Sequence, residues 1–280
     1  MRAPAAPLPR GIWLLVALLG SGALLLRTWA LGSVPGINGD EAWYGLRIIE
    51  WGQGNAGWLT PTGNPLNPFY LAPTALAQGL FAPALWSLRV AAVLSGVLTV
   101  VVAFVVGRRL WSAPVALVIA AVVAFLPQSI AYSRFGWDAS QSVLFVWLLL
   151  AAAQGGQLVL SVAALIIALW VHPTNVFAAP AALALLGHRL HGQGRLSRRR
   201  VLVTVALGLV AVVVVFVRFR HLLPWQTMVD NSTSLARWGE SGRLWVQLLS
   251  GTTIYRYISG AGHGADSFVL DLAWGAVLLC

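Results

Sequence analysis

The chain has 280 residues, of which 59% are hydrophobic and 9% are charged, and its mean hydropathy is +0.79. Soluble domains carry about 25% charged residues, so this composition excludes an ordinary soluble globule. The formal net charge of +10 comes from 18 arginines against eight acids, with no lysine. The arginines are dispersed around apolar segments rather than clustered on one polar surface, which argues against nucleic-acid binding. The single cysteine, Cys280, excludes an intrachain disulfide and a cysteine zinc site.

Apolar segments recur along the whole chain, and a helix that crosses a bilayer needs about 20 such residues. Backbone amides in hydrocarbon must be bonded within their own segment, so these segments are predicted to be helices. The predicted fold class is therefore all-α, a polytopic transmembrane helical bundle. For the first segment a cleaved signal peptide is the alternative, because Arg2 and Arg10 precede it. The predicted spans are 11–31, 88–107, 113–131, 139–154, 157–171, 174–187, 201–217 and an incomplete one from 268.

The arginines also predict the orientation of these spans. If the N-terminus lies in the cytoplasm, the cytoplasmic side receives nine arginines and no acid, and all eight acids lie outside. This predicts a multi-pass protein of the plasma (inner) membrane with a first outer loop at 32–87 and a second at 218–267. The basic segment 188–200 becomes a cytoplasmic topology anchor, with binding of lipid headgroups as the alternative.

The first outer loop contains a short apolar segment, 69–82, which is interrupted by Pro73 and followed by Pro83. If this segment crossed the membrane, every later loop would change sides and the basic segment would face out. It is therefore predicted to be an interfacial helix that lies on the outer leaflet.

Two acids stand side by side in "GINGDEAWYG", a few residues after the first span. Asn38-Gly39 is a suitable helix start and would place Asp40 and Glu41 in the first turn, where acids favour the positive end of the helix dipole. Neighbours on a helix point about 100° apart, so both carboxylates cannot address one atom in the same way. From these residues alone, helix capping and a chemical role both stay open.

The predicted topology brings further polar groups to the same surface. Asp138 lies there in "SRFGWD", and His172 lies there in "WVHPT". Ionisable groups at membrane depth are costly, so such a cluster is a functional-site hypothesis by default. Transporters place such groups near the midplane of broken helices, and here they gather at one surface.

The order of these segments along the chain resembles that of a known family. "GDEAWYG", an interfacial helix, "SLRVAAVLSGVLTVVVAFVVGRRLW", "AYSRFGWDAS" and "ALWVHPTNVFAAPAAL" follow one another as in the N-terminal half of the GT-C membrane glycosyltransferases. The nearest branches are the aminoarabinose transferases of lipid A and the protein O-mannosyltransferases. The resemblance covers residues 11 to about 217. It implies that 1–280 is a single GT-C-like module, an N-terminal fragment of a longer protein.

The resemblance also implies partners and a reaction. The donor would be a polyprenyl-phosphate sugar, and the acceptor a lipid, a glycan or a protein on the outer face of the membrane. A carboxylate takes the acceptor's proton as it attacks the anomeric carbon, and a single base favours inversion. A transporter, a lipid flippase or a GT-C-like scaffold without catalysis are the alternatives.

Residue roles follow from the same resemblance. Asp40 would be the catalytic base, with Glu41 as runner-up or as its hydrogen-bond partner, and Asp138 the second acid of the site. His172 would bind phosphate, ligate a metal or only mark a polar turn. Arginine binds phosphate through a bidentate fork. The arginine candidates are Arg134 first, then Arg89, Arg237 and Arg256.

Two expectations are left open. The family carries a Lys or His before a "PP" pair late in the first loop, whereas this chain has "NPLNPFY", and Asn67 cannot supply that charge. No cofactor is required by the sequence. A divalent metal bound by Asp40, Glu41 and His172 or His263 stays an alternative, for which no ligand spacing argues.

Overall fold

The computed structural model describes residues 9–194, except 56 and 62–64, and the isolated residues 206, 208 and 213. Every regular element within this part is helical, and its one β contact is an isolated bridge between Leu59 and Pro65. The predicted all-α class is therefore confirmed. The predicted spans at 201–217 and from 268 lie outside the described residues, as does the loop at 218–267 with Arg237, Arg256 and His263.

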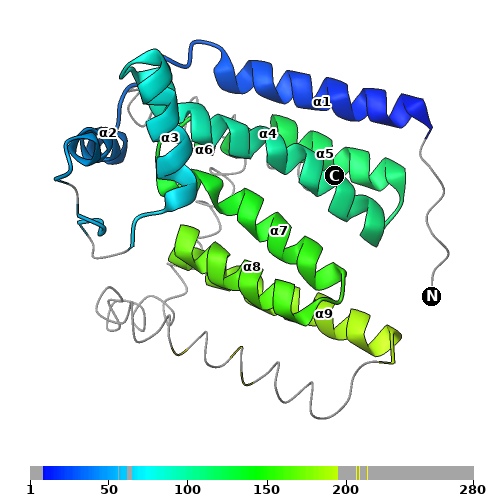
Figure 1. Cartoon of the computed structure of the whole chain (residues 1–280). Coiled ribbons are helices and arrows are strands. Elements are labelled where there is room, and N and C mark those ends of the chain that lie inside the picture. The colour runs from blue at the N-terminus through cyan, green and yellow to red at the C-terminus, as the bar shows by residue number, and fades with distance from the viewer. Residues whose placement is uncertain are drawn as a thin grey trace, which may run out of the picture.

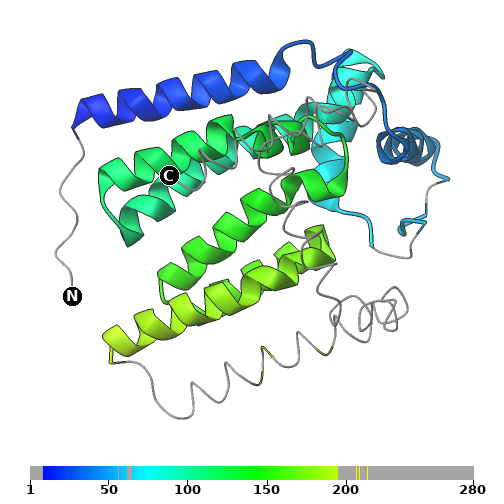
Figure 2. The same ribbon diagram turned by 180° about the vertical axis from the view of Figure 1, so that it is seen from behind.

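The helices form a layered bundle with a cap at one end (Figures 1 and 2). In both views α1 lies on one side of the α4–α5 pair, and α7 followed by α8 and α9 lies on the other. Helices α2 and α3 lie across one end of this bundle. The elements are α1 (Arg10–Thr28), α2 (Gly39–Gly52), α3 (Pro68–Phe81), α4 (Leu85–Leu110), α5 (Ala113–Phe125), α6 (Pro127–Tyr132), α7 (Ser142–Gln154), α8 (Leu158–Val171), α9 (Ala179–Gly192) and the 3₁₀ helices η1 (Asp138–Gln141) and η2 (Pro173–Ala178).

Two of the described helices are long and apolar enough to cross a membrane, namely α1 with 19 residues and α4 with 26. At 1.5 Å per residue they measure about 28 and 39 Å, against about 30 Å of hydrocarbon. Helices α5 and α7 have 13 residues each, and α8 has 14. The predicted spans at 113–131, 139–154 and 157–171 thus form apolar helices, and these are shorter than predicted.

Prolines cause two of the breaks. Leu126 and His172 both have extended backbone, and each precedes a proline. A residue before proline is forced out of the helical region by the proline ring. The predicted span at 113–131 is therefore divided into α5 and α6. The break at His172 separates α8 from η2, and the predicted span at 174–187 begins as η2 and continues as α9.

Small side chains allow the first three bundle helices to pack closely. Helix α5 buries a stripe of alanines four residues apart, and α1 and α4 complete the cluster. Such stripes let helix backbones approach in the membrane, where dispersion forces rather than hydrophobic exclusion hold helices together. The buried cluster consists of Val16, Ala23, Val100, Phe104, Ala116, Ala120 and Ala124.

One charged residue lies inside this packed region. Arg27 of α1 is fully buried and donates to the carbonyl oxygens of Ala124 and Val123, at 2.9 and 3.1 Å. Those carbonyls belong to the last turn of α5, where a helix leaves its acceptors unpaired. Arg27 therefore caps α5 from a neighbouring helix. The sequence analysis did not assign this residue a role.

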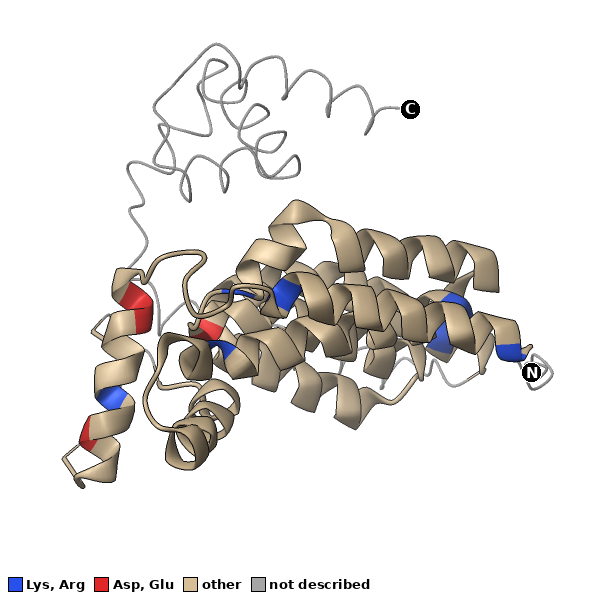
Figure 3. Ribbon diagram, turned by 90° about the horizontal axis from the view of Figure 1, so that it is seen from above, with Lys and Arg blue, Asp and Glu red and all other residues tan. Residues whose placement is uncertain are grey.

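Charges are distributed unequally between the two ends of the bundle. The acidic residues of the described part of the chain gather at the end where α2 and α3 lie (Figure 3). The four acids are Asp40, Glu41, Glu50 and Asp138. The opposite end carries Arg108 and Arg109 in the last turn of α4, Arg189 in the last turn of α9 and Arg10 at the start of α1.

Candidate functional site at the α2 end of the bundle

Helix α2 begins with a capping box. The side chain of Asn38 accepts the backbone N–H of Glu41 at 2.8 Å, and Glu41 Oε2 accepts the backbone N–H of Asn38 at 3.3 Å. This arrangement satisfies two donors that the helix start would otherwise leave free. The capping interpretation is thus confirmed for Glu41. Asp40 lies in the same first turn but is exposed.

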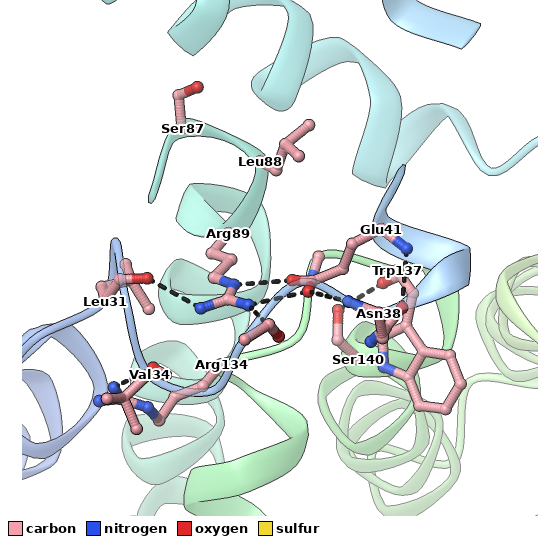
Figure 4. A network of polar contacts seen from close by, with 12 residues as sticks. Leu31, Val34, Asn38, Glu41, Ser87, Leu88, Arg89, Arg134, Trp137 and Ser140 are labelled. Atoms are coloured by element: carbon pink, nitrogen blue, oxygen red, sulfur yellow. Dashed lines mark hydrogen bonds and ion pairs between the residues drawn. The ribbon is translucent and has the colours of Figure 1, made fainter. Parts of the chain in front are cut away.

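Glu41 is turned into the protein, where it meets Arg89 of α4 (Figure 4). Both side chains are fully buried. Arg89 Nε donates to Oε1 at 2.7 Å and Nη2 donates to Oε2 at 2.8 Å, so the pair is bidentate. The backbone N–H of Gly136 adds a third contact, to Oε1 at 2.6 Å. A carboxylate has about four acceptor positions, and those of Glu41 are taken by the protein itself.

Two arginines fasten the linker between α1 and α2. Arg89 donates to the carbonyls of Leu31 and Gly36 at 2.8 and 3.1 Å. Arg134 donates to the carbonyls of Leu26, Trp29 and Val34, all near the end of α1.

This geometry gives Arg89 and Arg134 a role that differs from the predicted one. Both are buried, and most of the donors of each are engaged by the protein. They hold the start of α2 in place. Phosphate binding by either residue stays a prediction, and it would require these contacts to open.

The loop that returns to Glu41 requires a glycine. A Cβ atom added at Gly136 would lie 2.8 Å from the carbonyl oxygen of Leu88 and 2.9 Å from the hydroxyl of Tyr70. Contacts this short do not occur for real Cβ atoms, and the Leu88 partner is backbone that cannot move aside. The glycine in "RFGWD" therefore allows the loop to press against α3 and α4 and carry Asp138 into position.

Asp138 and His172 form the second part of the site. Asp138 begins η1, accepts the N–H of Ala139 at 2.8 Å and accepts a hydrogen bond from the hydroxyl of Tyr44. His172 ends α8, and its Nδ1 lies 2.7 Å from the hydroxyl of Thr174. Helix α8, which ends before His172, contacts η1, which Asp138 begins, so the turns in "SRFGWD" and "WVHPT" lie on neighbouring elements.

Charges and burial act against each other in this cluster. Burial raises the pKa of Asp138, and the nearby His172 and the hydrogen bond from Tyr44 oppose the increase. Burial lowers the pKa of His172, and Asp138 opposes the decrease. The charge of Asp40 raises the pKa of Asp138 further. The partly buried carboxyl of Asp138 is thus influenced both by an exposed carboxylate and by an imidazole.

Tyr44 is the member of this cluster that the sequence analysis missed. It is buried in α2, and burial followed by the charge and hydrogen bond of Asp138 raises its pKa. Its ring packs edge-on against Tyr70 at 5.0 Å between centroids. The available signal was its spacing, because Tyr44 follows Asp40 by four residues and so lies on the same side of a helix.

The polar residues of the loop before α3 are structural. Asn67 accepts the N–H of Phe69 at 3.0 Å as the N-cap of α3 and donates to Gln141 at 2.9 Å. Trp170 of α8 donates its indole N–H to the carbonyl of Leu66 at 3.0 Å. These contacts tie the segment before α3 to η1 and α8, and Asn67 supplies no cation.

The metal alternative receives no geometric support. No group of three or more His, Cys, Asp or Glu side chains that could hold a metal ion occurs among the described residues. Glu41, one of the ligands considered, is engaged by Arg89 instead.

The comparisons with known proteins address the fold. No family model and no curated protein matches the sequence. Among solved structures the chain is similar to ArnT from Cupriavidus metallidurans in its apo state, with a TM-score of 0.50 and 18% identity. The match covers 92% of this chain and 57% of that chain. The fold is GT-C-like. The chain therefore spans somewhat more than half the length of this neighbour, and at 18% identity the likeness concerns the fold alone.

Proposed function

We propose that this chain is the N-terminal module of an integral-membrane glycosyltransferase that uses a polyprenyl-phosphate sugar as donor. The observation that supports this most is the gathering of Asp40, Asp138, His172 and Tyr44 at one end of a GT-C-like bundle. The acceptor would be a hydroxyl or amine on a lipid, glycan or protein. Acid–base catalysis often uses titratable groups whose environments shift their pKa values in different directions. In this cluster, burial raises the pKa of Asp138 and lowers that of His172.

Asp40 is the proposed general base. It is exposed in the first turn of α2 and has a free approach for an acceptor, whereas Glu41 is buried under the same turn. The acceptor oxygen or nitrogen gives its proton to Asp40 and attacks the anomeric carbon. The bond from that carbon to the donor phosphate breaks, and the polyprenyl phosphate leaves with the electron pair. With a single carboxylate acting as base, the sugar configuration is inverted.

His172 is the proposed contact for the leaving phosphate. In the tautomer that lets Nδ1 accept the N–H of Thr174, at 3.4 Å, the neutral imidazole carries its proton on Nε2. Nε2 is then the donor for a phosphate oxygen. The charge of Asp138, which acts on the same ring, would stabilise the imidazole in this position.

Replacing Asp138 with asparagine tests this site. Loss of a charge-assisted contact typically costs 1.5–3 kcal/mol, so kcat/KM for transfer is expected to fall by about tenfold to a hundredfold. The unfolding temperature is expected to equal or exceed that of the wild type, because asparagine removes the cost of ionising a buried carboxyl.

The direction of the pKa shift of Asp138 predicts how the stability of the wild type changes with pH. A carboxyl whose pKa rises on folding loses stabilisation as the pH increases from its unfolded value of 3.8 through its folded value. The stability advantage of Asp138→Asn over the wild type should therefore grow from about pH 4 upward. Thermal unfolding across pH and transfer from a radiolabelled donor measure both effects, with Glu50→Gln as the control acid. Wild-type transfer in Asp138→Asn would remove Asp138 from the site.

We also propose that the α2 end of the bundle faces out of the cell and the opposite end faces the cytoplasm. The separation of acids from Arg10, Arg108, Arg109 and Arg189 supports this orientation. Asn55 and Gln193 are exposed at opposite ends. In a Cys280→Ala background, a membrane-impermeant thiol reagent added to intact cells should label Asn55→Cys and leave Gln193→Cys unlabelled. The reverse pattern would invert the topology.

A further inference from the structure

A second hollow lies away from the acid cluster, between α7 and α8 and the last turn of α4. Its volume is about 410 Å³, within the ~300–1,000 Å³ range of ligand pockets. Its walls are apolar side chains, among them Phe145, Leu148, Leu160 and Ile167. The small alanine side chains of α7 and α8 leave the space open between these walls. Leu148 and Leu160 remain 39% and 51% exposed, so the hollow opens sideways as a groove.

The polar groups of this groove are confined to one end. Arg109 and Gln157 line it at the end of the bundle opposite Asp40. Arg109 is exposed and makes no hydrogen bond or ion pair with any residue in the part of the chain that the structure describes. Its neighbours at this end are cations as well. The groove therefore combines apolar walls with one unpaired guanidinium at its mouth.

We propose that the groove binds one anionic glycerophospholipid, with an acyl chain between α7 and α8 and the phosphate on Arg109. The apolar walls exclude a polar ligand, and the guanidinium offers the planar fork that suits phosphate. A lipid carries both features in one molecule and reaches a sideways-opening groove from the bilayer.

Native mass spectrometry of the full-length protein tests whether the charge of Arg109 retains an anionic lipid. In detergent supplemented with phosphatidylglycerol or phosphatidylcholine, the wild type should retain phosphatidylglycerol preferentially. Arg109→Gln should weaken this retention by about tenfold, as for loss of a charge-assisted pair. Arg10→Gln is the matched control, since it removes an exposed cation from the same end outside the groove. Equal losses in both variants, or no retention by the wild type, would overturn the proposal.

Two further variants test whether the lipid binds in the groove between α7 and α8. Ala163→Trp fills the groove and should abolish retention of phosphatidylglycerol, whereas Val118→Trp places the same ring on an exposed face of α5 and should not. A benzophenone amino acid at Leu160 should crosslink to phospholipid on illumination. Crosslinking of this position to a peptide from 195–280 of the same chain would show that the protein itself fills the groove, and would overturn the proposal.

Discussion

Asp40→Asn is expected to slow sugar transfer by about a hundredfold or more in the full-length protein and to leave its folding unchanged. Removing a general base typically costs 10²–10⁴ in rate. Asparagine keeps the size of the side chain and much of its capping ability. Because Asp40 is exposed and outside the Glu41–Arg89 contacts, loss of its charge at a helix start costs at most about 0.3–1 kcal/mol. The measurement is turnover at saturating donor and acceptor, alongside the unfolding temperature.

Glu50→Gln provides the matched control for this experiment. Glu50 is another acid of α2, paired with Arg47 at 2.8 Å, and its substitution should leave transfer unchanged. If Asp40→Asn retains near wild-type turnover, the acids serve as caps or surface charges, and a transporter, a flippase or a scaffold without catalysis becomes the better explanation of the cluster.

Glu41→Gln is expected to destabilise the protein by about 3–5 kcal/mol, because it leaves Arg89 buried without a counter-charge. The glutamine amide would also place donors opposite Arg89 and the N–H of Gly136, where only acceptors fit. Arg89→Gln should have a loss of similar size, since it strands Glu41 together with the carbonyls of Leu31 and Gly36. Thermal or denaturant unfolding in one detergent measures both.

The partly exposed pair Arg47–Glu50 is the control here as well. Surface ion pairs contribute about 0–1 kcal/mol, so Arg47→Gln should change the stability little. A Glu41→Gln variant that unfolds like the wild type but transfers no sugar would contradict the positioning role. It would restore Glu41 as a candidate for the catalytic base.

Local sequence signals predicted several features well. Asn38-Gly39 predicted the start of α2, because a short polar side chain before an amphipathic segment satisfies free backbone donors. The segment at 69–82 predicted α3 within one residue at each end. The predicted span at 157–171 ends where α8 ends, before His172. Each of these depends on the chemistry of a few neighbouring residues.

The roles of the charged residues depended on the tertiary structure instead. Arg89, Arg134 and Glu41 all lie where the topology predicted, at the α2 end of the bundle. Apart from the local contact of Glu41 with Asn38, their partners include residues 48 to 108 positions away in the chain, which no local pattern predicts. A buried charge must be paired, so the packing of α4 against α2 assigned Glu41 to Arg89 and left Asp40 free.

The sequence by itself predicted that the chain is helical and membrane-like and that the four acids of the described residues gather at one end, because hydropathy and charge distribution act residue by residue. Only the tertiary structure decided which acid is exposed and which is buried, and that Tyr44, Asp138 and His172 share one site. The physical reason is that burial and pairing depend on neighbours from distant helices. The same limit explains why α5 is shorter than its apolar segment suggested, since hydropathy does not register where the backbone before a proline must leave the helix.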